Sequence, residues 1–259
     1  MKRIGLLGKK LGMSQIFDQE GHCLPVTLLE VGPCYVTALR TKEKDGYSAV
    51  QIGFDPAREK RVSKPVQGQA KKAGTPLLRR IKEIRTDEIE GLAPGAKLTV
   101  DNFEAGDWVD VRGTSIGRGF QGVVKRHHFK GSLSKSHGSM FGRVPGSIGA
   151  SSFPSRVIKG MKAAGHMGNK PITIQNIRVL KVDQESNVLM LHGSVPGAEE
   201  GYLLIQTALK KGDAQRKWKV QASAVKDESS GKAKTSGGSS EAPHENVSSD
   251  GSSQETEKS

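Results

Sequence analysis

The chain has few cysteines, which cross-link small proteins, few aromatic residues, and no long apolar run of the kind that spans a membrane. It contains two cysteines, Cys23 and Cys34, which are too few for a disulfide framework and are not spaced like a zinc knuckle. Aromatic residues make up 5% of its 259 residues. No apolar run approaches the roughly 20 residues that a bilayer-spanning helix needs. We therefore expect a protein of the reducing cytoplasm.

The most informative absence is that of acidic residues between Val111 and Val182. This stretch holds 13 of the 40 lysines and arginines and none of the 27 aspartates and glutamates, which leaves 27 basic residues against 27 acidic ones elsewhere. The formal net charge of +13 therefore comes from this one stretch. Uncompensated charge of one sign at this density predicts a polyanionic partner, and nucleic acid is the first candidate.

Glycines are interspersed among these cations, and large apolar residues are sparse, so the stretch has little material for a core. The glycines are Gly113, Gly117, Gly119, Gly122, Gly131, Gly138, Gly142, Gly146, Gly149, Gly160, Gly165 and Gly168. Glycine lets a backbone approach phosphate closely, and Arg and Lys add charge-assisted hydrogen bonds. This spacing argues against a merely solvated cationic loop. The sequence has no helix-turn-helix, zinc finger or basic zipper, which favours RNA over DNA.

The flanking segments predict an antiparallel β-barrel or sandwich. Short runs rich in Val, Ile, Thr and Tyr, separated by turn residues, fill Ile4–Phe54 and return after Ile172. The basic stretch is then an insertion between strands. Residues 55–74 indicate a loop or an arm, and Leu77–Glu90 fits a short helix and a strand about equally. From about Ala222 onward the chain has almost no apolar content and cannot offset its ordering entropy, so we expect a disordered tail.

Two local signals refine the first strands. Asp45-Gly46 is a typical hairpin turn. Pro25 lies inside a strand-like run, which indicates an edge or a bulge because proline cannot donate to a ladder.

Three patterns resemble nucleotide or metal sites without meeting the chemical requirements. Gly117–Gly122 matches GxGxxG, but the following residues (VVKRHHF) are strand-like and no acid occurs before Asp183. Gly5–Lys10 lacks the glycine spacing and the Ser or Thr of a phosphate-binding loop. Four histidines have no nearby carboxylate or thiol, and the surrounding cations disfavour Zn²⁺; they are His127, His128, His137 and His166. We expect no metal, no cofactor and no catalytic residue. An enzyme acting on RNA or a nucleotide is the rival hypothesis.

Several segments, taken in order, are similar to the large-subunit ribosomal protein L3 family (uL3), in its bacterial form. They are Gly5–Phe17 (GLLGKKLGMSQIF), the stretch from Phe103 to Arg126 with GTSIGRGFQGVVKR, Arg143–Gly149 (RVPGSIG), Lys159–Asn169 (KGMKAAGHMGN) and Ser194–Gly197 (SVPG). The resemblance covers about Met1 to Lys211. It implies a translation-protein β-barrel whose internal extension threads into 23S rRNA and approaches the peptidyl transferase centre. It also implies an early role in subunit assembly and contacts with ribosomal proteins L14 and L19.

At one position the sequence differs from the pattern of the family. Some bacterial members of the family carry a methylated glutamine directly after the GSIG segment. Ala150 stands at that position here, so the modification cannot occur at it.

We accordingly predict a mainly β protein: an antiparallel barrel with a small α+β insertion and a long basic internal extension. The expected division is 1–58 barrel, 59–97 insertion, 98–126 barrel, 127–171 RNA-binding loop, 172–211 barrel and 212–259 disordered tail. The predicted RNA-binding residues are Arg112, Arg118, Lys125, Arg126, His127, His128, Lys130, Lys135, His137, Arg143, Arg156, Lys159, Lys162, His166 and Lys170. The predicted loop tip is Val144, Pro145, Gly146, Ser147, Ile148, Gly149, Ala150, Ser151, Ser152 and Phe153. The alternative function is a non-ribosomal RNA-binding chaperone or regulator.

Overall fold

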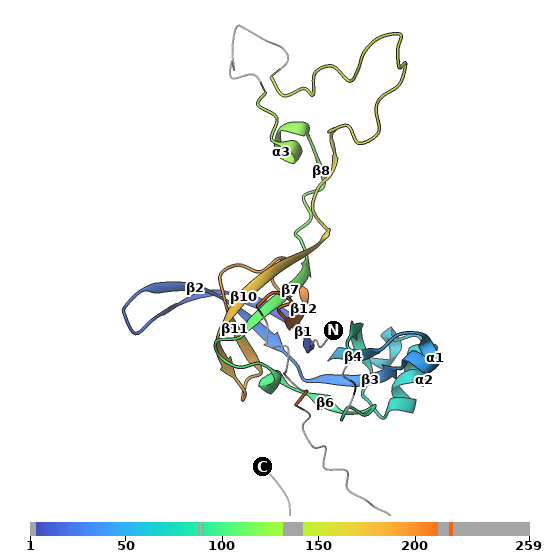
Figure 1. The fold of residues 1–259 in the computed structure, drawn as a ribbon, viewed down its shortest axis with the longest axis vertical. Coiled ribbons are helices and arrows are strands. Elements are labelled where there is room, and N and C mark those ends of the chain that lie inside the picture. Colours follow the sequence, from blue (N-terminus) through green and yellow to red (C-terminus); the bar gives the residue numbers. More distant parts are fainter. Residues whose placement is uncertain (1–3, 88, 90, 132–141, 212–217, 220–259) are drawn as a thin grey trace, which may run out of the picture. The chain divides into compact units, whose positions relative to one another are not determined.

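The computed structural model describes residues 4–87, 89, 91–131, 142–211 and 218–219 (Figure 1). None of the helices in these ranges is long and apolar enough to cross a membrane.

Six antiparallel strands close into a barrel in the order β1-β12-β7-β10-β11-β2. They are β1 (Gly5–Phe17), β2 (Cys23–Val31), β7 (Trp108–Thr114), β10 (Pro171–Asp183), β11 (Val188–His192) and β12 (Tyr202–Thr207). The prediction of an antiparallel barrel is confirmed. The strands that precede the basic stretch and those that follow it are hydrogen-bonded neighbours, so the stretch is an insertion into a closed sheet.

Alternating side chains of these strands fill the barrel. In β12, Leu203 and Ile205 are almost fully buried, and Val109 and Val111 of the adjacent β7 have no exposed area. Burying each such side chain stabilises the fold by about 1.5–3 kcal/mol. The apolar residues that alternate in the sequence are thus the ones that form the core.

A second sheet, ordered β5-β4-β3-β6, lies beside the barrel and shares its core cluster. Its strands are β3 (Cys34–Arg40), β4 (Ala49–Pro56), β5 (Leu78–Arg85) and β6 (Lys97–Leu98). The prediction that residues 1–58 are all barrel is therefore wrong for β3 and β4. Alternation identifies a strand but does not say to which sheet it pairs, and the turn at Gly32-Pro33 separates the two sheets.

The segment expected to be a loop contains a helix. Residues 55–74 form η1 (Glu59–Arg61) and α2 (Lys64–Ala73), which begins after Ser63 and ends at Gly74 in a left-handed conformation. A Ser before the helix, a proline in its first turn and a glycine after its end are ordinary helix boundaries. The helix was missed because only two of its residues, Ala70 and Ala73, are buried.

The open choice at Leu77–Glu90 resolves as strand β5, paired with β4 from Leu78 to Arg85. The predicted turn at Asp45-Gly46 does join β3 to β4, but it is the end of a helical turn, α1 (Lys42–Asp45), with Gly46 at a φ of 79°. Close to β6 lies a short helical turn, η2 (Val100–Asn102).

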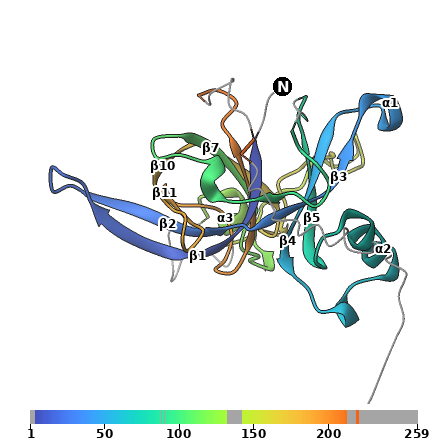
Figure 2. The same cartoon turned by 90° about the horizontal axis from the view of Figure 1, so that it is seen from below.

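Strands β1 and β2 continue past the barrel as a two-stranded ribbon. Strand β1 pairs with β12 only from Gly5 to Lys9, whereas its pairing with β2 runs on to Phe17, after a bulge near Lys10 (Figure 2). Strand β2 pairs with β11 only from Val26 onward, so Pro25 has one strand neighbour. The prediction of an edge position at Pro25 is confirmed.

Two residues of the segment expected to be disordered are ordered against the body. The backbone N–H of Lys219 donates to Asn102 Oδ1 at 2.8 Å, and Asn102 Nδ2 donates to the Lys219 carbonyl at 3.0 Å. Trp218 packs against the core. The expectation of disorder over 212–259 does not hold for these two residues, and the rest of that segment lies outside the described residues.

A buried carboxylate joins β7, β10 and the segment that follows β12, close to the point where the inserted stretch begins. Asp110 in β7 is 8% exposed; its Oδ1 accepts the N–H of Asn176 at 3.0 Å, and its Oδ2 accepts the N–H of Leu209 at 3.2 Å. Asn176 lies in the bulge of β10, where the ladder between β7 and β10 skips from Ile174 to Ile177. The carboxylate therefore satisfies backbone donors that the bulge and the end of β12 leave without ladder partners.

Replacing Asp110 with Ala should lower the free energy of unfolding by about 1–3 kcal/mol, because two partly buried N–H groups lose their acceptors. Urea denaturation of the full chain measures this. Glu185→Ala, an exposed acid in the turn after β10, is the matched control and should change stability by less than about 0.5 kcal/mol. Equal midpoints for the two variants would contradict this role for Asp110.

Candidate nucleic-acid interface

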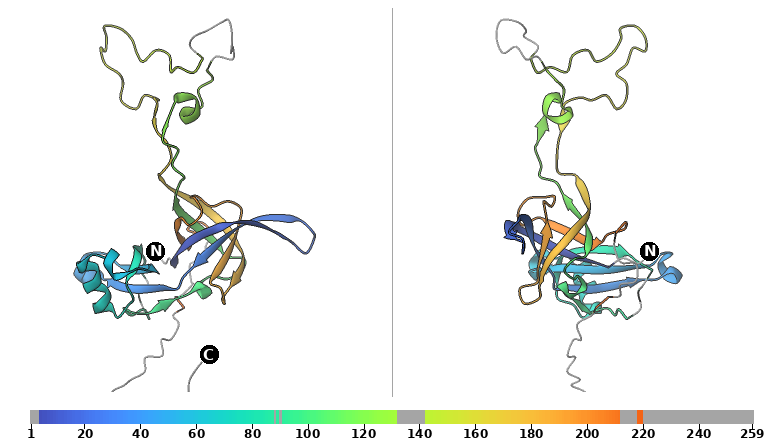
Figure 3. Two further views of the ribbon diagram at one scale, coloured as in Figure 1. Left: turned by 180° about the vertical axis from the view of Figure 1, so that it is seen from behind. Right: turned by 60° about the vertical axis from the view of Figure 1, so that its left-hand side comes forward.

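The inserted stretch leaves the barrel as two paired chains, here called the stalk (residues 115–121 and 165–170). The β7–β10 ladder reaches Thr114 opposite Pro171, and Ser115 continues it. Ser115 Oγ accepts the N–H of Lys170 at 3.1 Å, and the Ser115 N–H donates to the Lys170 carbonyl at 2.9 Å. The insertion thus starts as an extension of the sheet and not as a free loop (Figure 3).

Farther out, the two chains stay hydrogen-bonded. The N–H of Arg118 donates to the Met167 carbonyl at 2.9 Å, and the N–H of Met167 donates to the Gly119 carbonyl at 2.9 Å. Strands β8 (Phe120–Gln121) and β9 (Gly165–His166) then form a short antiparallel pair. This succession of bonds fixes the direction in which the rest of the insertion leaves the body.

Gly168 is required for this close pairing. Its φ is +79°, and a Cβ on it would collide with the backbone carbonyl oxygen of Ile116. A backbone obstacle cannot move aside as a flexible side chain does. The glycine is therefore used here to bring two chains together, a use different from the phosphate approach that its position among cations suggested.

A short helix closes the far end of the stalk. Helix α3 (Val123–His127) follows Gly122, and Val123 is 1% exposed. The strand-like interpretation of VVKRHHF is therefore wrong, because five residues with two β-branched members are too few to separate a strand from a helical turn. The GxGxxG match still lacks its acid, since none occurs before Asp183.

Two of the predicted RNA ligands have structural contacts instead of free side chains. Arg126 Nη1 donates to the Ala163 carbonyl at 2.8 Å, and His127 Nε2 lies 3.0 Å from the same oxygen. Both side chains are half-buried. They connect α3 to the returning chain, so they hold the insertion together whatever else they contact.

Beyond α3, the described residues 128–131 and 142–164 contain neither helix nor strand. Every residue of the predicted tip, Val144–Phe153, is exposed, and Phe153 is 87% exposed. Ile148 and Ile158, 58% and 65% exposed, likewise find no core to pack into. Apolar side chains held out in this way are suited to contacts with another molecule.

The remaining predicted ligands lie on the surface. Those that the structure places as exposed are Arg112, Arg118, Lys125, His128, Lys130, Arg143, Arg156, Lys159, Lys162, His166 and Lys170. Lys135 and His137 lie outside the described residues. Arg112 is at the foot of the stalk, in β7, while the others are distributed along the stalk and the loop. The predicted cations therefore lie along the length of one insertion and do not line a single pocket.

None of the ion pairs between described residues involves a cation of this insertion. By contrast, Arg40 on the body lies 2.8 Å from Asp45 and 3.4 Å from Glu83. The described residues also contain no group of three or more potential metal-ligating side chains. The charge of the insertion is thus available to an external partner.

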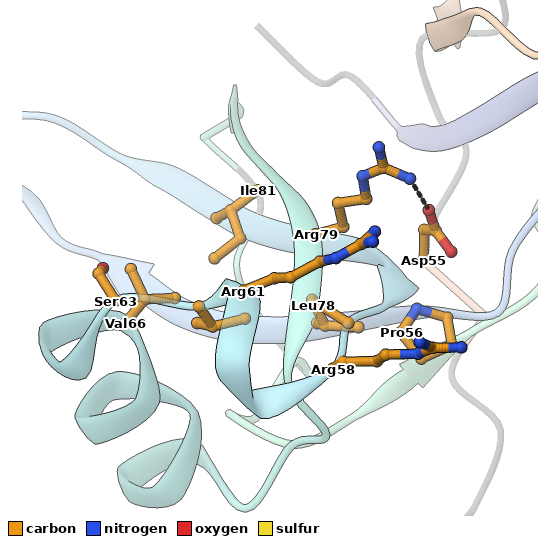
Figure 4. A pocket seen from close by; sticks show the side chains of 11 residues that line it. Asp55, Pro56, Arg58, Arg61, Ser63, Val66, Leu78, Arg79 and Ile81 are labelled. Atoms are coloured by element: carbon orange, nitrogen blue, oxygen red, sulfur yellow. Dashed lines mark ion pairs between the residues drawn. The ribbon is translucent and has the colours of Figure 1, made fainter.

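Sequence reasoning missed a second group of cations, on the body. Arg58, Arg61 and Arg79 line a cleft of about 740 Å³ between η1, α2 and β5 (Figure 4). A neighbouring cleft of about 660 Å³ at the foot of the stalk is lined in part by Arg80, Lys82 and Arg112. The alternating cations of β5 were the available signal, but their side could not be assigned while the segment fitted helix and strand equally.

These arginines are oriented by aromatic and acidic neighbours. The Arg80 guanidinium lies 4.7 Å from the ring centroid of Tyr202, and Arg79 lies 3.8 Å from Asp55. The Tyr202 hydroxyl donates to Asp55 Oδ2 at 2.5 Å. Burial, followed by this hydrogen bond, raises the pKa of Tyr202, so the hydroxyl stays protonated and remains a donor.

Gly168→Ala should weaken the stalk, whereas Gly117→Ala should not. Gly117 has an ordinary φ, and its added Cβ would lie 3.7 Å from Asn169 Cβ, which is normal contact. Amide hydrogen exchange in the full chain measures the difference at Arg118 and Met167, whose N–H groups bond across the stalk. We expect at least tenfold faster exchange in Gly168→Ala only; unchanged exchange would show that the stalk tolerates a side chain there.

The sequence matches the family described as Ribosomal protein L3 over residues 82–188. A large ribosomal subunit protein uL3 from Synechococcus sp. (strain CC9605) is 51% identical over 210 residues, 81% of this chain and 95% of the relative. The proteins of the same name from Herpetosiphon aurantiacus and Alkaliphilus metalliredigens are each 48% identical and matched over 97% and 99% of their lengths. Because relatives this similar are matched over nearly their whole length, the chain belongs to the uL3 family of large-subunit ribosomal proteins.

Proposed function

We propose that this chain binds 23S rRNA through its acid-free insertion and so helps to shape the RNA of the large subunit. As a uL3 protein it is a structural, non-enzymatic ribosomal component. The observation that carries the proposal is a row of exposed cations, none of which is ion-paired to a described acid, on a stalk that the barrel holds. The barrel serves as the base and the insertion as the RNA-binding element.

The binding mechanism is electrostatic in its first part. Each Lys or Arg that neutralises a phosphate releases condensed counterions, so the affinity depends steeply on salt. Arg156, Lys159 and Lys162 lie near one another in the sequence of the returning chain and are all exposed. Lys125 and Lys130 are exposed on the outgoing chain, so both chains of the insertion carry cations, which suits a site enclosed by RNA on several sides.

The second part of the mechanism is close packing. Gly146 has a φ of +83° and no atom within 4 Å of a Cβ position, so its backbone is open to a neighbouring phosphate or base. Phe153 supplies an exposed ring on which a base can stack. We propose that this tip, Val144–Phe153, extends toward the peptidyl transferase centre, where it supports the RNA and supplies no catalytic group.

The clefts on the body provide a second RNA contact. Arg58, Arg61 and Arg79 present guanidinium groups, whose planar donors match phosphate oxygens. Early action in subunit assembly and contacts with proteins L14 and L19 are part of the proposal through the family resemblance. Early binding fits a protein whose insertion must be in place before RNA closes around it.

Sedimentation separates this proposal from an RNA chaperone or regulator that binds only transiently. Large subunits washed at high salt should retain the chain in one copy per subunit, because an enclosed insertion is held by more than charge. Release at salt concentrations that remove electrostatic binders would favour the transient alternative. For the enzymatic rival, joint replacement of His127, His128, His137 and His166 should abolish no turnover in the isolated protein.

Lys159→Ala combined with Lys162→Ala should reduce the steepness of the salt dependence. Two lost phosphate contacts change the slope of log affinity against log salt by about 1.5. Filter binding of the full chain to 23S rRNA at several salt concentrations gives the slope. The control pair, Lys42→Ala with Lys44→Ala in α1, removes the same charge from the body and should leave the slope unchanged. Equal slopes for both pairs would contradict loop-mediated phosphate binding.

Phe153→Ala should weaken rRNA binding by about 1–3 kcal/mol, the usual contribution of an aromatic ring stacked on a base. Phe153→Tyr keeps the ring and should bind like the unchanged chain. Because the side chain is 87% exposed, neither change should alter the unfolding midpoint. If Ala and Tyr bind equally well, the ring does not stack on RNA.

A further inference from the structure

The β1–β2 ribbon has a surface chemistry opposite to that of the insertion. From Leu11 to Leu39 the sequence contains no Lys or Arg, while Asp18, Glu20 and Glu30 fall within that range. Asp18 and Glu20 are at the ribbon's turn, where both are exposed. In a protein of net charge +13, this projecting element is acidic and therefore poorly suited to contact phosphate.

One face of the ribbon exposes two large apolar side chains, with the polar Gln15 between them. The register places Met13 and Phe17 opposite Thr27 and Cys23, and opposite residues in an antiparallel pair share a face. Met13 is 53% exposed and Phe17 68% exposed. The hydrogen bond from Cys23 Sγ to Gln15 Oε1, at 3.3 Å, fits this assignment of the face.

The ribbon also has an unused backbone edge. Beyond Lys9, β1 pairs only with β2, so from Gly12 to Phe17 no strand of the described chain occupies its outer edge. A two-stranded ribbon is marginally stable alone, and an open apolar edge favours addition of another strand or association. The ribbon, formed by β1 and β2 in Figure 2, thus offers both exposed apolar side chains and the backbone groups that a protein partner uses.

The neighbouring strand extends this chemistry. Strand β11 pairs with β2 along Val26–Glu30, and the sequence from Val182 to Leu209 again contains no Lys or Arg. Asp183 at the end of β10 and Glu185 in the turn that follows add further acidic residues. The acidic character is therefore not confined to the tip of the ribbon but continues onto the part of the barrel beside it.

We propose that the β1–β2 ribbon is a protein-docking surface for a basic protein of the same subunit. Phe17 and Met13 supply the apolar contact, and Asp18 and Glu20 attract the partner's Lys or Arg side chains. The inference rests on the proposed function in so far as the partner is found in the large subunit. It divides the surface of the chain into an RNA-facing insertion and a protein-facing ribbon.

Photo-cross-linking in assembled subunits tests this directly with two matched aromatic sites. Phe17 in the ribbon and Phe153 in the loop tip are each replaced by p-benzoylphenylalanine in the full chain, and large subunits are purified and irradiated. Both rings are exposed, so neither replacement disturbs a core. The ribbon probe should cross-link to Lys/Arg-rich peptides of another protein, and the tip probe should cross-link to rRNA.

Cys23 gives an independent reading in the unaltered protein. It is exposed and lies opposite Phe17, whereas Cys34 is buried and burial raises the pKa of its thiol to about 12. N-ethylmaleimide should therefore report on Cys23 alone. We expect at least tenfold slower modification of Cys23 in the large subunit than in the free chain.

The outcomes separate the two proposals. Cross-links from the Phe17 site to rRNA, or equal Cys23 reactivity in both states, would overturn protein docking at the ribbon while leaving rRNA binding by the loop intact. A protein cross-link from the Phe17 site with no rRNA cross-link from the Phe153 site would support the ribbon and contradict the loop. The Cys23 measurement uses the unsubstituted chain. A negative result there therefore cannot be attributed to poor assembly of a variant.

Discussion

The structure depends on one electrostatic constraint: the stretch from Val111 to Val182 carries 13 cations and not a single carboxylate, and ten of these cations lie in the insertion between Ser115 and Lys170. Such a segment cannot neutralise itself, and it lacks the apolar residues to collapse around a core of its own. Elsewhere the chain pairs its charges, as Arg40 does with Asp45 and Glu83. Within the insertion, the described cations other than Arg126 are exposed. We propose that a dense polyanion supplies the missing negative charge.

Presentation requires a rigid base, and the barrel provides it. The two chains of the insertion are continuations of β7 and β10, which are hydrogen-bonded neighbours in the closed sheet. Asp110 secures the bulge of β10, and Gly168 allows the backbones of the stalk to approach. Arg126 and His127 then join helix α3 to Ala163. These hydrogen bonds fix the position of the stalk and of α3 relative to the barrel. The exposed loop begins where such hydrogen bonds end.

The sequence was most informative for features that depend only on neighbouring residues. The alternation of apolar and polar residues predicted the barrel strands, and the absence of Asp and Glu located the insertion. It was less informative where the outcome depends on distant partners. Strands β3 and β4 alternate like barrel strands but pair in the second sheet, and α2 was missed because it buries little beyond two alanines. Among the predicted ligands, Arg126 donates a hydrogen bond to the carbonyl of Ala163, 37 positions away in the sequence. No rule of sequence spacing predicts such a contact. The arginines around β5 came together only through the fold.

The molecule therefore separates two kinds of surface on one scaffold, with cations and glycines on the insertion and acids with apolar side chains on the ribbon. Limited trypsin digestion, followed by mass spectrometry, tests the central claim that RNA completes the insertion. In the free chain, rapid cleavage is expected after Arg156, Lys159 and Lys162, which are exposed and outside any helix or strand. In the intact large subunit the same three bonds should resist cleavage. Equal cleavage in both states would contradict the account.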